Sequence, residues 1–171
     1  GIGLRDKIGI ALPNNIDHVV ALIGIAKAGA VAVPINGRFK KLELRHVVRA
    51  SDMKLLLAHA GGGALRDQAP LVADALPGLD EKGAEVRTPE APLLRHVVSM
   101  GPDTPAGWMS RGEFASKATG VSDQELRRRG YSVRMRDPFL LMFTSGPTAA
   151  PKAAILSHEA LSRQAASLAD T

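Results

Sequence analysis

Short apolar runs alternate with helix-like segments over residues 7–58, and this order constrains the fold more than any other feature of the chain. Each run is short enough for a buried strand, and the segments between them carry apolar residues at helical spacing. Strands that alternate with helices along a chain build a parallel sheet with helices packed on it. We therefore predict an α/β fold, a layered parallel or mixed β-sheet flanked by helices. The predicted strands are residues 7–12, 30–35 and 53–58, and the predicted helices are residues 16–28 and 42–52.

Turn and capping residues set the ends of several elements. Asn15 is predicted to cap the first helix, and Gly29 stands where a left-handed residue commonly ends a helix. Further along, Ser110 and Glu113 have the spacing of a capping box. We place no helix in residues 116–137, which we interpret as a mobile, charged connector. The other predicted elements are helix 64–76, strands 94–100, 139–143 and 153–156, and helix 158–169 with Ser157 as its cap.

The composition favours a single domain with an aliphatic core. Hydrophobic residues make up 45% of the 171 residues and aromatic residues only 4%, as expected for a parallel sheet covered by helices. The sequence contains no cysteine, which excludes disulfides and cysteine-based zinc sites. No apolar run approaches the roughly 20 residues that a membrane-spanning helix needs. We expect a soluble, cytoplasmic protein without a membrane span.

Basic residues gather in one stretch and raise the question of nucleic-acid binding. The net charge is +5, and Tyr131 is the only aromatic residue within the cluster. A nucleic-acid groove normally interleaves aromatic side chains with its cations. We therefore favour a solvated connector over a nucleic-acid site, and we expect Tyr131 and Trp108 to pack rather than to stack on bases. The cluster comprises Arg127, Arg128, Arg129, Arg134 and Arg136.

The most informative motif follows the apolar run at residues 139–143. The chain passes there into a loop of small hydroxyl-bearing residues, a glycine and two prolines, and the loop ends in a single lysine. Free backbone N–H groups, hydroxyl donors and one cation together suit a bound polyphosphate. The predicted phosphate contacts are Thr144, Ser145, Gly146, Thr148 and Lys152.

Residues 144–152, TSGPTAAPK, resemble the phosphate loop of the adenylate-forming enzymes, the acyl-CoA synthetase superfamily. The likeness extends to residues 3–14, GLRDKIGIALPN, to residues 21–36, ALIGIAKAGAVAVPIN, and to the Leu-Ser-His of residues 156–158. The resemblance implies the N-terminal portion of an acyl-CoA synthetase, most similar to the fatty-acid ligases.

The resemblance implies a two-step reaction. A carboxylic acid attacks the α-phosphate of ATP to give an acyl-adenylate and pyrophosphate, and the acyl group then passes to a thiol, usually that of coenzyme A. ATP with Mg²⁺, coenzyme A and a small fatty carboxylic acid are thus the implied ligands. Within one AMP-binding domain we expect a βαβ layer over residues 1–100, a divergent connector over 101–137, and the phosphate-loop strand, loop and helix over 138–171. We assign no catalytic residue and no metal ligand to the chain.

Three positions depart from the family's phosphate loop. Pro147 replaces Ser or Thr and so removes a hydroxyl and a backbone N–H donor. Ala149 replaces a glycine, which costs on the order of 1 kcal/mol where the backbone needs a positive φ. Ala153 replaces the glycine after Lys152. Two lost donors, at roughly 1.5–3 kcal/mol each, would weaken phosphate binding by ~10²-fold or more.

Family segments without a counterpart leave two hypotheses open. These segments are the aromatic-Gly-x-Thr-Glu motif, the Thr-Gly-Asp motif and the C-terminal catalytic lysine, so we expect that the chain alone cannot run the complete reaction. The first hypothesis is a fragment of an ATP-dependent acyl-CoA synthetase. The alternative is a non-catalytic, truncated or degenerate remnant that binds at most a nucleotide or a partner.

We also expect self-association, because the strand and helix at the two ends of the chain leave their outer edges without a packing partner.

Other motifs are weaker. Gly146 and Lys152 have almost the spacing of a P-loop, but proline and alanine occupy its defining Gly and Ser/Thr positions. The glycines at 61–63 lack the dinucleotide-binding spacing, which favours a flexible turn. The histidines show no metal-ligand spacing, so we expect them at the surface or at helix edges. They are His18, His46, His59, His96 and His158.

Overall fold

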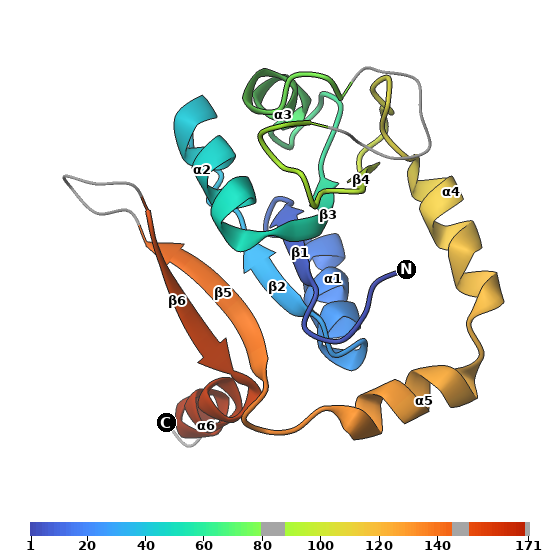
Figure 1. Ribbon diagram of the computed structural model, residues 1–171, viewed down its shortest axis with the longest axis vertical. Helices are drawn as coiled ribbons and strands as arrows, with labels where there is room; N and C mark the ends of the chain where they lie inside the picture. The colour runs from blue at the N-terminus through green and yellow to red at the C-terminus, as the bar shows by residue number, and fades with distance from the viewer. Residues whose placement is uncertain (80–87, 145–150, 170–171) are drawn as a thin grey trace.

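A mixed β-sheet forms the centre of the molecule (Figure 1). The computed structural model describes residues 1–79, 88–144 and 151–169. Within these residues the sheet has six strands in the order β4-β3-β1-β2-β5-β6, all neighbours parallel except the antiparallel pair β5–β6. The predicted α/β fold with a mixed sheet is therefore confirmed. The strands are β1 Lys7–Ala11, β2 Val31–Pro34, β3 Met53–Ala58, β4 His96–Ser99, β5 Pro138–Thr144 and β6 Lys152–Ser157.

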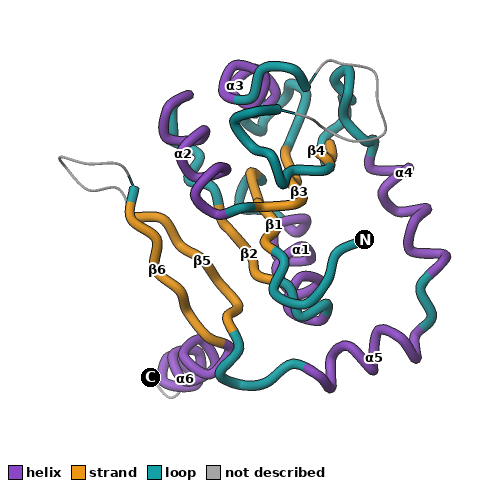
Figure 2. Tube along the Cα trace, viewed as in Figure 1, coloured by secondary structure: helices purple, strands orange, loops and turns teal. Residues whose placement is uncertain are grey.

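Helices cover both faces of the sheet (Figure 2). On one face, Leu44 of α2 and Val72 of α3 join Leu56 of β3 in the larger core cluster. On the other face, Ile25 of α1 joins Ile8 of β1 in a second cluster, with α4 and α6 packed at its margin. The helices are α1 Ile16–Lys27, α2 Lys41–Ser51, α3 Ala69–Ala75, α4 Arg111–Ser116, the 3₁₀ turn η1 Lys117–Gly120, α5 Asp123–Ser132 and α6 His158–Ala169.

The strands alternate between the two cores because successive side chains of a strand point to opposite faces. In β2, Val31 and Val33 belong to the larger core, whereas Ala32 belongs to the second. Leu56 and Leu44 are 0% and 1% exposed. Burial of each such side chain contributes roughly 1.5–3 kcal/mol relative to exposure. The core is aliphatic, as the composition predicts.

The predicted caps are confirmed where the backbone turns into a helix. The side chain of Asn15 accepts a hydrogen bond from the His18 N–H at 3.2 Å and caps α1. Gly29 follows this helix with φ +69°, the left-handed conformation that glycine adopts without cost. Ser110 caps α4 and pairs with Glu113 in a capping box, and Ser157 accepts from the N–H of Ala160 at 3.2 Å.

The stretch between β4 and β5 corrects two predictions. Residues 123–132 form α5, where we predicted a connector and placed no helix. Together α4 and α5 lead along the outside of the sheet toward β5 (Figure 1). Trp108 is buried in the larger core as predicted, but Tyr131 is 85% exposed, so its predicted packing is wrong.

The helix predicted over residues 64–76, before β4, is shorter in the structure, because α3 begins only at Ala69.

Helix α1 leaves an apolar face uncovered. Ile25 is its one buried residue, whereas Ile16 is 72% exposed and Val20 59% exposed. Val19 and Ile23 complete the same face, because residues three and four apart on a helix are neighbours.

In the part of the chain that the structure describes, no helix is long and apolar enough to cross a membrane.

Candidate phosphate-binding site

The hairpin β5–β6 brings the two ends of the predicted phosphate loop together. Thr144, the last residue of β5, lies directly opposite Lys152, the first residue of β6, in the antiparallel register. Of the five predicted contacts, these two are therefore placed side by side by the fold. Ser145, Gly146 and Thr148 lie outside the described residues, as do Pro147 and Ala149.

The local sequence explains why the chain turns into strands here. Leu141 and Phe143 point to the larger core and are 8% and 9% exposed, whereas Leu140 belongs to the second core. This alternation anchors β5 between both helical layers. Thr144 lies beyond the buried part of the strand and is exposed, so its hydroxyl can meet a ligand.

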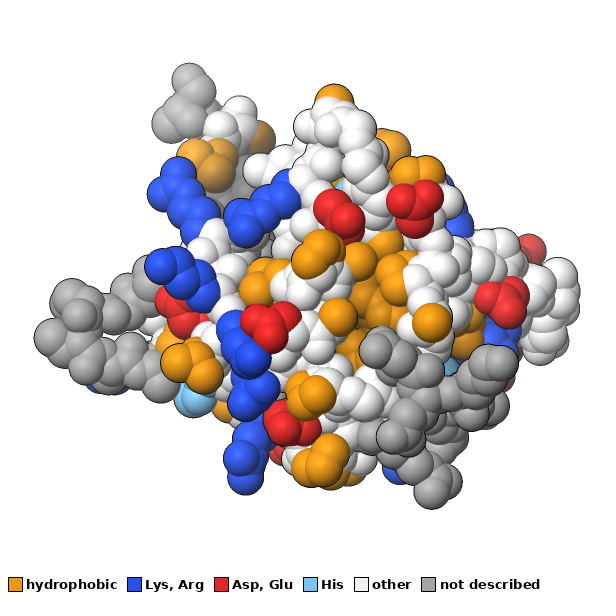
Figure 3. All heavy atoms as spheres, turned by 90° about the horizontal axis from the view of Figure 1, so that it is seen from above, with side chains coloured by type: hydrophobic (Ala, Val, Ile, Leu, Met, Phe, Trp, Pro, Cys, Tyr) orange, Lys and Arg blue, Asp and Glu red, His pale blue; other side chains and the backbone are white. Residues whose placement is uncertain are grey.

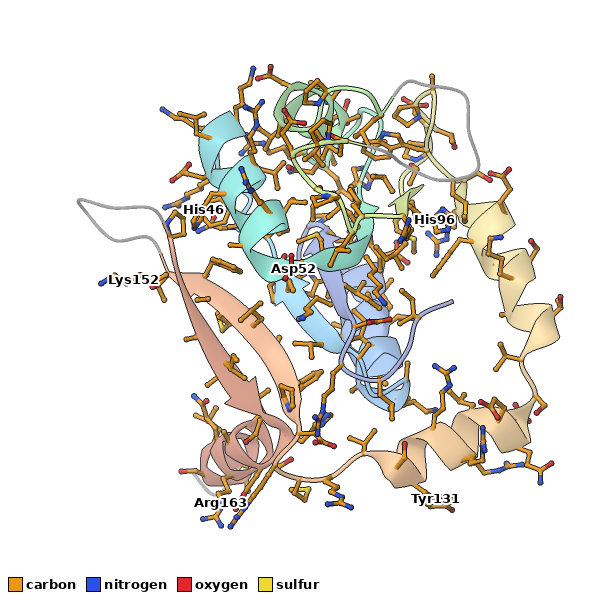
Figure 4. All side chains as sticks on the ribbon, viewed as in Figure 1. His46, Asp52, His96, Tyr131, Lys152 and Arg163 are labelled. Atoms are coloured by element: carbon orange, nitrogen blue, oxygen red, sulfur yellow. The ribbon has the colours of Figure 1, made fainter. Side chains whose placement is uncertain are left out.

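Lys152 is the single cation that the hairpin offers at this end. Its side chain is exposed and extends away from the body of the molecule (Figure 4). Among the described residues it forms no ion pair. The Thr144 hydroxyl donates to the Lys152 carbonyl oxygen over 3.5 Å, which is long for a bond of this kind. A weakly held hydroxyl and an ammonium group without an ion pair in the described ranges thus belong to residues that face each other in the hairpin, and both groups are suited to anionic oxygens.

His46 is a residue of this site that the sequence analysis missed. Its Nε2 atom lies 3.0 Å from the carbonyl oxygen of Pro151, directly before Lys152. Its ring also meets the ring of Phe143 edge-on, with centroids 6.3 Å apart and planes at 90°. His46 is half-buried on α2, so the expectation of a helix-edge position holds, but its contact with the loop was not predicted. Because 105 residues separate His46 from Pro151, no local pattern could have indicated it.

Two other histidines differ from the expected surface positions. His59 is 7% exposed, and its Nε2 atom is buried without a hydrogen-bond partner among the described residues. His158 stacks on Phe139, with ring centroids 4.9 Å apart, and its Nε2 atom is likewise buried and unpartnered within the described ranges. Burial lowers the pKa of His158 below its usual 6.5, while the nearby carboxylate of Asp137 acts in the opposite direction.

Acidic side chains neutralise much of the arginine cluster. Glu125 pairs with Arg128 at 3.2 Å and with Arg129 at 3.5 Å, and Arg136 lies 3.8 Å from Glu159. On the face seen from above in Figure 3, Asp and Glu side chains likewise lie beside a band of Lys and Arg side chains. This pairing leaves less free charge for a polyanionic partner. Within residues 1–79, 88–144 and 151–169, no group of three or more His, Cys, Asp or Glu residues is placed to hold a metal ion.

A cavity of about 330 Å³ lies on the opposite face of the sheet, between α1, α4 and the strands. Its lining is almost entirely apolar and includes Ile8, Leu57 and Phe114. Asp17 is the charged residue of the lining, and its carboxylate pairs with Arg111 of α4 at 2.8 Å. Because this carboxylate is already paired, the cavity offers little beyond an apolar surface, and we assign it no ligand.

Sequence comparisons point to one family. Residues 1–171 match the family described as AMP-binding enzyme. A "Medium/long-chain-fatty-acid--CoA/3-oxocholest-4-en-26-oate--CoA ligase" of Mycobacterium tuberculosis (strain CDC 1551 / Oshkosh) is 32% identical over 163 residues, covering 95% of this chain and 26% of the relative. The human "Medium-chain acyl-CoA ligase ACSF2, mitochondrial" is 26% identical over 164 residues, covering 92% of this chain and 26% of the relative. The chain thus spans about a quarter of the length of these curated relatives.

Solved structures show the same fold. The Mycobacterium tuberculosis fatty acyl CoA synthetase superposes with a TM-score of 0.68 at 24% identity, covering 100% of this chain and 28% of that structure. The N-terminal domain of FACL13 from the same organism has a TM-score of 0.68 at 23% identity, covering 100% of this chain and 36% of that structure. These matches confirm that the architecture is that of an N-terminal portion of such proteins, as the resemblance of residues 144–152 predicts.

Proposed function

We propose, since this chain belongs to the AMP-binding enzyme family, that it forms the part of an ATP-dependent acyl-CoA synthetase that receives the phosphates of ATP. One observation carries the proposal: Thr144 and Lys152 face each other where β5 and β6 meet the predicted phosphate loop. Lys152 is exposed and forms no ion pair among the described residues, so its charge is available to an anion. The phosphate contacts stay those predicted: Thr144, Ser145, Gly146, Thr148 and Lys152.

The role of these side chains follows from the charge that the reaction moves. When a carboxylate displaces pyrophosphate from ATP, negative charge gathers on the leaving group, and a preorganised cation with hydroxyl donors stabilises it. Lys152 supplies the cation and Thr144 a hydroxyl. Mg²⁺ that arrives with the nucleotide would share the charge of the phosphates.

We propose a fatty carboxylic acid as substrate and coenzyme A as the acceptor of the acyl group. The support is the family and the printed names of the relatives, which are medium- and long-chain acyl-CoA ligases. The reaction as a whole needs more of the enzyme than this chain contains, since the relatives are about four times its length. A cytoplasmic location stays a prediction.

Binding of magnesium-ATP to the 171-residue chain tests the proposal. Isothermal titration should give saturable binding that Lys152→Ala weakens about tenfold or more, because a charge-assisted contact is lost. Lys117→Ala is the matched control, because Lys117 is an exposed lysine that lies on η1, away from the hairpin. Equal affinity of the Lys152→Ala variant and the parent would contradict the assigned site.

The non-catalytic alternative predicts a different result in the same titration. A folded chain that binds no magnesium-ATP would be a scaffold of this family without a working phosphate loop. The replacements Pro147 and Ala149, which lie outside the described residues, are the sequence features that favour it.

We also propose self-association through the free edge of β6. Among the described residues β6 pairs only with β5, and Ile155 is 70% exposed on it. An unpaired apolar edge is a template for another strand. Light scattering coupled to gel filtration should show a dimer or larger species that Ile155→Lys converts to monomer. A monomeric parent chain at high concentration would rule the edge contact out.

A further inference from the structure

We infer that His46 positions the backbone of Pro151 and Lys152, where the predicted phosphate loop ends, an inference that rests on the proposed function. The Nε2 atom of His46 lies 3.0 Å from the carbonyl oxygen of Pro151. A carbonyl oxygen can only accept a hydrogen bond, so Nε2 carries the proton and donates it. Both the neutral ring protonated on Nε2 and the imidazolium ion satisfy this contact.

The backbone of Pro151 depends on this bond. Pro151 is buried, and proline has no N–H, so its carbonyl is its one backbone polar group. A buried carbonyl without a partner is costly, and His46 provides the partner. The hydrogen bond therefore favours the one conformation in which the end of the loop meets α2.

The helix that carries His46 is a rigid support. Leu44 and Val47, its neighbours on α2, are 1% and 0% exposed in the larger core. The rings of His46 and Phe143 form a T-shaped pair, and Phe143 is a core residue one position before the end of β5. His46 thus contacts the strand that enters the phosphate loop and the residue that leaves it.

Fixing the Pro151 carbonyl orients Lys152. The atoms of one peptide unit lie in a plane, so the position of the Pro151 oxygen sets the direction of the bond to the Lys152 nitrogen and Cα. In Figure 4, His46 lies between α2 and the hairpin, whereas the Lys152 side chain extends outward on the far side of the strand. The backbone from which the Lys152 side chain extends is therefore fixed before the ligand arrives, and a preorganised backbone needs less reorganisation during binding.

Two variants at the same position separate this role from simple packing. In His46→Gln, the side-chain N–H₂ can reach the place of Nε2 and restore the bond to Pro151. In His46→Asn, the shorter amide reaches only the place of Nδ1 and cannot restore it. His18→Asn is the control elsewhere, because the Nδ1 atom of His18 also lies near a backbone carbonyl, that of Leu12 at 3.4 Å, but on α1.

The experiment measures two quantities on the 171-residue chain. Amide hydrogen exchange by NMR reports the order of the Lys152 and Ala153 backbone, with Leu56 of β3 as the internal reference. Titration with magnesium pyrophosphate, the probe used here, reports phosphate affinity. We expect His46→Asn to speed exchange at Lys152 about tenfold and to weaken pyrophosphate binding about fivefold, as loss of one hydrogen bond would do. His46→Gln should stay within about twofold of the parent chain in both measurements.

The two readouts keep this inference distinct from the proposed function. Unchanged exchange at Lys152 in His46→Asn overturns the inference whatever the affinity, and so do equal effects of the Gln and Asn variants. A parent chain that binds no pyrophosphate overturns the proposed function instead. If in that case His46→Asn speeds exchange at Lys152 and His46→Gln does not, the result supports the positioning of this backbone by His46.

Discussion

The guanidinium group of Arg111 donates two hydrogen bonds to the carboxylate of Asp17 and so connects α4 to α1. One guanidinium nitrogen lies 2.8 Å from Oδ1 and the other 3.1 Å from Oδ2. Paired contacts of this kind add geometric specificity that a single ammonium group lacks. The pair stands at the wall of the apolar cavity and closes a contact between residues 94 positions apart.

We predict that this pair stabilises the fold measurably. Arg111→Lys keeps the charge but loses the paired geometry, and it should lower the free energy of unfolding by about 0.5–1 kcal/mol. A double-mutant cycle with Asp17→Asn, followed by urea denaturation, should give a coupling of about 1 kcal/mol. The Glu125–Arg128 pair on α5 is the control. Arg128 is 79% exposed, so this pair should couple more weakly than Arg111 and Asp17. Equal coupling in both cycles would refute the claimed advantage.

Gly101 marks a place where two backbones approach closely. A Cβ atom at this position would lie 2.0 Å from the carbonyl oxygen of Ala60, and a backbone atom cannot rotate away. Gly101→Ala should therefore lower the free energy of unfolding by about 3 kcal/mol. Gly62→Ala is the matched variant, since a Cβ there meets nothing within 4 Å and should change stability by less than about 0.5 kcal/mol. Thermal or urea unfolding that ranks the two variants equally would contradict this account.

His158 should make the fold sensitive to mild acid. Burial lowers the pKa of His158 in the folded state below its usual value of 6.5. As the pH falls below 6.5, His158 therefore takes up a proton more readily in the unfolded chain than in the folded protein. The stability associated with neutral His158 is thus full above pH 6.5 and is lost as the pH falls through the lower folded-state value. His158→Phe keeps the stacking on Phe139 and should flatten this dependence between pH 7.5 and 5.5 in urea denaturation.

Asp6 titrates at lower pH than His158, so its titration does not contribute to the change in stability between pH 7.5 and 5.5. Burial opposes ionisation of Asp6, but the ammonium group of Lys54 and the Gly3 N–H outweigh it and hold the pKa of Asp6 below 3.8. The contribution of ionised Asp6 to stability is full above pH 3.8 and is lost as the pH falls through the lower folded-state pKa.

A His158→Phe variant that loses as much stability as the parent between pH 7.5 and 5.5 would show that groups other than His158 cause the effect.

Restoring the phosphate loop should strengthen nucleotide binding. The double variant Pro147→Thr, Ala149→Gly regains one hydroxyl, one backbone N–H and the conformational freedom of glycine, and should bind magnesium-ATP about tenfold tighter or more. Both positions lie outside the described residues, so this prediction rests on the sequence. The gain should vanish when Lys152→Ala is added in the same calorimetric titration. No gain would indicate that contacts made elsewhere in a full-length synthetase limit binding.

Local signals in the sequence predicted the first half of the fold well. The strands and helices from Lys7 to Ala58 follow from apolar spacing, and caps such as Asn15 act over three residues. Helix α5 was missed because its sequence, DQELRRRGYS, has almost no apolar face. The Ser122 cap and the pairs of Glu125 with neighbouring arginines support it instead. Periodicity cannot detect a helix of this kind.

Contacts between distant segments account for what sequence reasoning did not predict at the site. The motif around Thr144 and Lys152 was visible in the sequence, and antiparallel pairing brings its ends together. The contact of His46 with Pro151 depends on how α2 packs over the hairpin, which no local pattern records. Likewise, nothing in the sequence around Tyr131 indicates that its ring faces solvent.

The sheet order also determines when the chain can complete its sheet during folding. The first three strands are close in sequence, but β5 pairs with β2 only after residues 35–137 have been spanned. Closing a loop of that length costs more chain entropy than pairing near neighbours, and distant pairings form slowly. We therefore expect the pairing of β5 with β2 to gain protection last in a pulse-labelling refolding experiment, after the pairings among β1, β2 and β3. Strand β6, which carries Lys152, reaches the sheet only through β5 among the described residues, so it would join the sheet together with β5 at this late step.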